Sequence, residues 1–101
     1  MARYLVLVTF NKGKGTNQEH RDRGNQSKAW VQQHQASGVI ESAYTFSAGD
    51  SHQGGCAIVQ ANSQGDLQSW LRTNPASPSV SYETHELVEY SSGVDQLIGM
   101  Q

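Results

Sequence analysis

The stretch RYLVLVTF, residues 3 to 10, decides the fold, because it is apolar on both faces that alternate along a strand. Its β-branched and aromatic residues favour a β-strand rather than a helix. A strand with two apolar faces must be covered on both sides so that neither face is exposed to water. The rest of the chain therefore has to supply two covers for this strand.

The next elements alternate in type. A long segment poor in β-branched residues, 16–37, predicts a helix that stops at Gly38. Two short runs, 39–46 and 56–61, then read as strands. The polar stretch SAGDSHQGG (47–55) joins them, and its length predicts an antiparallel hairpin. Its glycines are expected to supply positive φ angles and its Asp and Ser to bond the turn.

A second helix and a last strand complete the order. Ser63 and Asp66 form a helix start, and Pro75 follows the helix end. The alternation of residues 79–90 predicts the strand. The apolar face of this helix consists of Leu67, Trp70 and Leu71.

The order βαββαβ predicts a ferredoxin-like α+β sandwich, a four-stranded antiparallel sheet with two helices on one face. Residues 1–101 are expected to form this single domain. The helices cover one sheet face, so the apolar open face predicts a homodimer or larger homo-oligomer. Residues 91–101, with three apolar residues at helical spacing, are expected to act as a C-terminal oligomerisation arm. These residues are Val94, Leu97 and Ile98.

Composition argues against several partners. The net charge is −2 and the basic residues are scattered, so we expect neither nucleic acid nor a membrane surface as a partner. The N-terminus lacks the features of a signal peptide, which favours a cytoplasmic protein. The lone Cys56 and the absence of a Cys/His cluster predict no metal site and no cofactor.

The segment 54–90 resembles the dimeric α/β-barrel superfamily, and within it the muconolactone isomerase-like proteins. It reads GGCAIVQANSQGDLQSWLRTNPASPSVSYETHELVEY, and SAG at 47–49 fits as its lead-in. The resemblance implies subunits that pair through their sheets into a barrel. It also implies an isomerase that moves a double bond by proton transfer, among relatives that include cofactor-free monooxygenases and cyclases. The matching features are Val59 to Ser63, Leu67 with Trp70, Pro75 with Pro78, and Leu87.

Proton transfer needs an acid or base in a water-poor cavity, and four residues are candidate catalytic groups. His85 alternates with Glu83 on one strand face, and a nearby carboxylate orients an imidazole and favours its charged form. His52 lies in the hairpin, where it can act from a barrel rim. The strand 39–46 adds the carboxyl of Glu41 and the phenol of Tyr44.

Three further residues are candidate substrate-binding groups: Tyr82, Glu86 and Phe46. Packing or solvation is the competing interpretation of each candidate. Pattern alone leaves both orientations of the last strand open, since each of its faces holds apolar and polar residues. If Tyr82 and Glu86 face the cavity, His85 faces the other way.

We therefore expect a protein that binds a small apolar or aromatic-derived molecule. If it is an enzyme, the prediction is a cofactor-independent isomerase or cyclase that acts by proton transfer. A non-catalytic ligand-binding or assembly module is the alternative, and a cofactor-free monooxygenase is the third. The sequence does not name the substrate.

Overall fold

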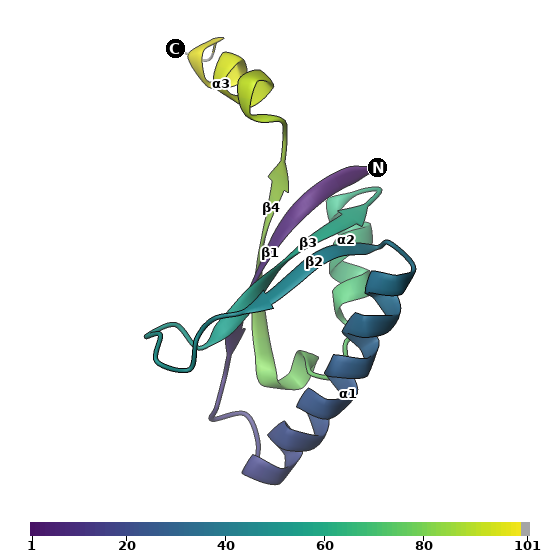
Figure 1. Cartoon of the computed structure of the whole chain (residues 1–101), viewed down its shortest axis with the longest axis vertical. Helices are drawn as coiled ribbons and strands as arrows, with labels where there is room; N and C mark the ends of the chain where they lie inside the picture. Colours follow the sequence, from purple (N-terminus) through teal and green to yellow (C-terminus); the bar gives the residue numbers. More distant parts are fainter. Residues whose placement is uncertain (100–101) are drawn as a thin grey trace.

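The computed structural model describes residues 1–99, with a four-stranded antiparallel sheet, two helices on one of its faces and a third helix apart (Figure 1). The strand order across the sheet is β2-β3-β1-β4. The predicted ferredoxin-like α+β arrangement is confirmed. The elements are β1 Ala2–Phe10, α1 Asn17–Ala36, β2 Ile40–Thr45, β3 Gly54–Ala61, α2 Gln64–Leu71, a 3₁₀ turn Ser77–Ser79, β4 Val80–Leu87 and α3 Tyr90–Gly99.

Side-chain caps define where the first two helices start. Thr16 and Glu19 form a capping box at α1, each side chain bonding the other residue's backbone N–H. The Ser63 side chain accepts a hydrogen bond from the Asp66 N–H at α2. Gly38 follows α1 with φ +86°, a conformation that favours glycine and ends the helix.

The alternating residues of β1 face two different environments. Tyr4 and Val6 point toward the helices and are buried, and Val59 lies opposite Tyr4 on β3. Leu5 and Leu7 point the other way, to a surface that no element of the described chain covers. The core on the helix side consists of Tyr4, Val6, Ile40, Val59, Leu67 and Leu71.

The structure fixes the orientation of β4, the edge strand beside β1. Tyr82 lies opposite Val8 on the helix face, and His85 lies opposite Leu5 on the open face. The strand ends at Leu87, so the predicted range 79–90 was too long. The chain leaves the sheet here because Glu89 caps α3, its carboxylate accepting a hydrogen bond from the Ser92 N–H at 3.0 Å.

The third helix stands apart from the rest of the chain (Figure 1). It carries Tyr90, Leu97 and Ile98, which are 82%, 68% and 63% exposed. The expected arm also included residues 100–101, which lie outside the described residues. Among the helices of the described chain, none is both long and apolar enough to cross a membrane.

The glycines of the hairpin between β2 and β3 have φ angles that differ in part from the prediction. Asp50 bonds the turn as expected, its carboxylate accepting from the His52 N–H at 2.8 Å. Gly54 has a positive φ, but Gly49 and Gly55 do not, which corrects the prediction for those two. Gly55 is required for space instead, because an added Cβ would overlap the Tyr44 carbonyl oxygen.

We expect Gly54→Ala to lower the free energy of unfolding by about 2 kcal/mol, or the melting temperature by about 10 °C. The added Cβ would overlap the backbone carbonyl of Val8, so β1 and β3 must move apart beside the hairpin. Gly49→Ala is the matched control, because an added Cβ there meets no atom within 4 Å. Equal melting temperatures for the two variants would contradict this account of the hairpin.

Candidate functional site

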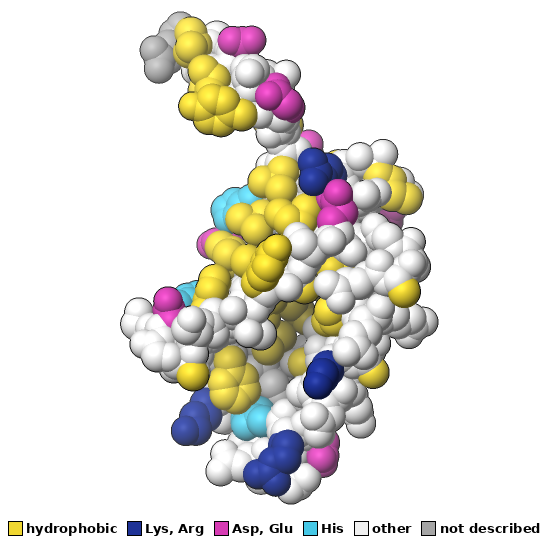
Figure 2. Space-filling view, in the orientation of Figure 1, with side chains coloured by type: hydrophobic (Ala, Val, Ile, Leu, Met, Phe, Trp, Pro, Cys, Tyr) yellow, Lys and Arg dark blue, Asp and Glu magenta, His cyan; other side chains and the backbone are white. Residues whose placement is uncertain are grey.

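A cavity of about 600 Å³ lies between the sheet and α1. It exists because α1 makes its sheet contacts mainly with the edge strand β2 and few with the central strands. Figure 2 shows the cavity as a hollow with apolar side chains in its interior. A volume of this size is typical of sites for small organic molecules.

The floor of the cavity is the helix-facing side of the sheet, where small apolar residues follow one another. Ala43 of β2 lies directly opposite Ala57 of β3, and Val6 of β1 continues that row. The next row contains Thr45, Gly55 and Val8 in the same register. Short side chains at these positions leave the space above them empty.

The wall opposite is a polar helix face. The residues of α1 that line the cavity recur at helical spacing, and most of their side chains are polar, with Trp30 and Val31 as the apolar ones. No residue of α1 is buried. A helix that packed into a core would present Leu or Ile here. The cavity-lining residues of α1 are Gly24, Ser27, Lys28, Trp30, Val31, Gln32 and Gln35.

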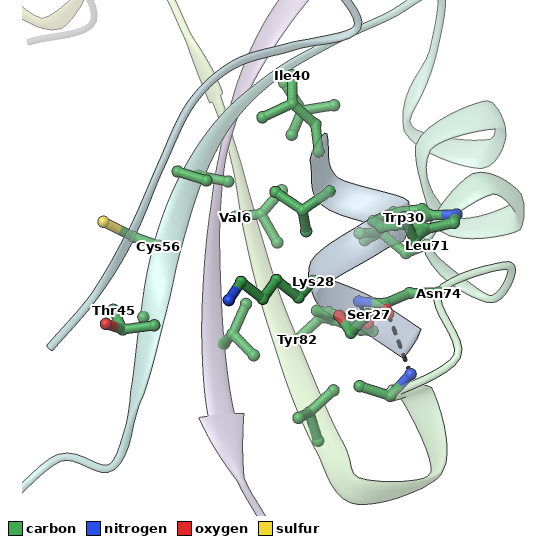
Figure 3. Close-up of a pocket in the computed structure, with 18 of the residues that line it drawn as sticks. Val6, Ser27, Lys28, Trp30, Ile40, Thr45, Cys56, Leu71, Asn74 and Tyr82 are labelled. Carbon is green, nitrogen blue, oxygen red and sulfur yellow. Dashed lines mark hydrogen bonds between the residues drawn. The ribbon is translucent and has the colours of Figure 1, made fainter. Parts of the chain in front are cut away.

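Lys28 is the only charged residue that lines the cavity within the described chain. Its side chain reaches from α1 toward the sheet (Figure 3). It makes no ion pair or side-chain hydrogen bond with any residue from 1 to 99. Its ammonium group is therefore available to a negatively charged group of a ligand.

Aromatic residues close the cavity beside Leu71. The rings of Trp30 on α1 and Trp70 on α2 lie 4.6 Å apart, and the His34 ring meets Trp30 edge-on at 4.7 Å. The Trp30 Nε1–H donates to Thr73 Oγ1 at 3.2 Å, which fixes the indole. Trp30 and Trp70 thus join α1 to α2 at this end of the cavity.

Tyr82 is the candidate substrate-binding residue whose side chain lines the cavity. Its hydroxyl accepts from Asn74 Nδ2 at 3.1 Å and lies 3.2 Å from Ser77 Oγ. Ser77 Oγ donates to the Leu71 carbonyl at 2.8 Å, so Tyr82 is the donor to Ser77. Burial raises the pKa of Tyr82, which keeps this group a neutral phenol near pH 7.

The other candidates from the sequence lie outside the cavity. Tyr44 borders it with its backbone strand, but its side chain is 67% exposed on the open face. His85 is on the same open face, with its Nε2 3.0 Å from the Glu83 carboxylate. Glu41 accepts a hydrogen bond from Arg3 Nε at 2.7 Å.

The remaining three candidates are spread over the two faces. His52 Nε2 lies 3.2 Å from Thr9 Oγ1, and its ring meets Phe46 edge-on at 5.2 Å, at the hairpin end of the open face. Glu86 is on the helix face, where the Tyr4 hydroxyl approaches it at 3.5 Å. The structure therefore brings together His52 with Phe46 and His85 with Glu83, but none of these with Tyr82.

Two features that define the cavity were not predicted from the sequence. Lys28 and the paired alanines were not singled out, although the polar residues at 27, 28 and 35 recur at helical spacing in the sequence. A helix that is polar on the side facing an apolar strand indicates a cavity rather than a core. The described lining contains no Asp, Glu or His, and residues 1–99 hold no group of three metal-ligating side chains.

Comparisons with known proteins bear on the fold. No protein-family model matches the chain, and no curated protein matches it. Among solved structures, the crystal structure of muconolactone isomerase at 3.3 Å resolution is similar, with a TM-score of 0.70 and 17% sequence identity. The match covers 89% of this chain and 92% of that one. The chain therefore has the α+β fold of muconolactone isomerase.

Proposed function

We propose that the protein binds a small organic anion in the cavity between the sheet and α1. The observation that carries this proposal is the polar face of α1 opposite an apolar floor across about 600 Å³. An apolar or aromatic body on the floor gains about 25 cal/mol for each Å² removed from water. A carboxylate at the other edge pairs with Lys28, the charged group of the lining.

The reaction that fits this site best is a cofactor-free isomerisation or cyclisation by proton transfer. Water that enters the cavity accepts a proton from a carbon beside a carbonyl and returns one to another carbon, because the described lining holds no Asp, Glu or His. The Lys28 ammonium stabilises the negative charge that develops in between. The Tyr82 hydroxyl accepts from Asn74 and donates its hydrogen to Ser77, so it borders the ligand as a neutral group and supplies no proton. The similarity in fold to muconolactone isomerase supports an isomerase over other reaction types.

The candidates on the open face require a second ligand space. His52, His85, Glu41 and Tyr44 lie on the side of the sheet away from the cavity, so they reach a ligand only between two paired sheets. Isotope labelling separates these possibilities. Unsaturated lactones in deuterated water take up deuterium at the carbon next to the carbonyl if the protein transfers protons. Loss of this uptake in His85→Ala assigns the reaction to the open face, and loss in Lys28→Gln assigns it to the cavity.

A non-catalytic binding or assembly module is the second candidate. It is favoured by the lack of a carboxylate or imidazole among the described residues that line the cavity. Binding of the lactones without deuterium uptake would support it. Consumption of oxygen with quinol substrates would support the third candidate, a cofactor-free monooxygenase.

We expect Lys28→Gln to weaken the binding of naphthoate about tenfold, because the substitution removes the charge that pairs with the carboxylate. Fluorescence of Trp30, at the cavity wall, follows the titration. Lys14→Gln, in the exposed loop before α1, is the matched control. The uncharged naphthamide should bind both variants equally, and a loss of naphthamide binding in Lys28→Gln would contradict the charge pairing.

The open face of the sheet points to assembly, and we propose a homodimer or larger homo-oligomer. Figure 2 shows apolar side chains gathered on the side of the sheet that faces away from the helices. Leu5, Leu7 and Ile58 lie together there in register. A contiguous apolar sheet face favours association, and a second copy has the matching surface. The exposed Leu97 and Ile98 of α3 support a contribution from the arm.

We expect sedimentation of the unmodified protein to give at least twice the chain mass of 11.0 kDa. Leu7→Lys should shift it to the monomer, because a lysine at the centre of the face must lose its hydration in the interface. Gln33→Lys, on the exposed side of α1, should leave the assembly unchanged. A monomeric unmodified protein at micromolar concentration would rule out the pairing of sheets.

A further inference from the structure

The helix-facing side of the sheet changes from filled to empty along three successive rows of side chains. The first row, with Ile40, Val59 and Tyr4, is 3% exposed or less at each residue. The second row contains Ala43 and Ala57 at the positions that face the cavity. Rows on one face lie about 7 Å apart and strands about 4.8 Å apart. The paired alanines therefore open a shallow floor next to a filled core.

Both sides of the cavity carry small residues. Alanine is depleted in strands, where β-branched and aromatic residues pack better, so two paired alanines oppose the local preference. On the other side, α1 presents Gly24 and Ser27, which also leave space. Positions that depart both from the residue preference of their strand and from close packing are typical of functional sites.

We propose that Ala43 and Ala57 determine the ligand specificity of the cavity. They admit an organic carboxylate whose body is a flat system of up to two fused rings. This inference rests on the proposed binding function. One ring face lies on the two alanine methyl groups, with Trp30 at its edge. The carboxylate reaches Lys28 on the opposite wall. The alanines alone do not make the site, since the cavity is bounded by α1 and by the indoles.

Ala57→Leu tests the proposal with two carboxylates that differ by one ring. The leucine adds three carbons above the floor, so naphthoate binding should weaken at least about tenfold, and benzoate binding should change less than about twofold. Tryptophan fluorescence titrations measure both affinities. Ala29→Leu, the same change on the exposed side of α1, should alter neither.

The melting temperature separates loss of binding from loss of fold. Leucine at position 57 adds apolar contacts in an empty space, so the melting temperature should stay equal or rise. If Ala57→Leu does not fold, Ala43→Val adds less volume on an edge strand, where a β-branched residue suits a strand. It should also weaken naphthoate more than benzoate.

The outcomes distinguish this inference from the function on which it rests. Equal naphthoate affinity in the unmodified protein and in a folded Ala57→Leu variant would overturn the role of the alanines, and leave the binding function standing. A parallel loss of both carboxylates would overturn the size selection. Failure of the unmodified protein to bind either compound would overturn the binding function and this inference together.

Discussion

The two apolar faces of β1 are the constraint on which the rest of the structure depends. Tyr4 and Val6 on one face are buried under α2 and the core, whereas Leu5 and Leu7 on the other face have no cover within the described chain. Burying an apolar strand on one side only leaves a costly surface on the other. The helices of the chain cover one face of this strand, and the proposed pairing of two sheets would cover the other.

The two helices that cover the sheet differ in the side chains that they turn toward it. α2 buries Leu67 and Leu71 against the sheet, as a core helix does. α1 buries no residue and turns Ser27, Lys28 and Gln35 toward the floor. α2 thus contributes most of the helical part of the core, and α1 forms the polar wall of the cavity, while Leu71 and the buried strand residues serve both the core and the cavity.

The sequence predicted the fold well because strand and helix periods, caps and the Pro75 break are local. Ser63 and Thr16 illustrate this, since each bonds a backbone group three residues away. The site was harder to predict, because it depends on which face of β4 meets the helices. Tyr82 and His85 differ by an odd number of positions, and only the pairing of Tyr82 with Val8 assigns their sides.

This assignment divides the chemistry of the chain between the two faces of one sheet. The imidazoles and carboxylates found by sequence lie mainly on the open face, among them His85 with Glu83 at 3.0 Å. The cavity holds an ammonium and a neutral phenol instead. A ligand in the cavity therefore meets an ammonium that stabilises negative charge, but no strong base. Any proton abstraction there must start from a carbon that is already acidified, such as one beside a carbonyl held close to Lys28.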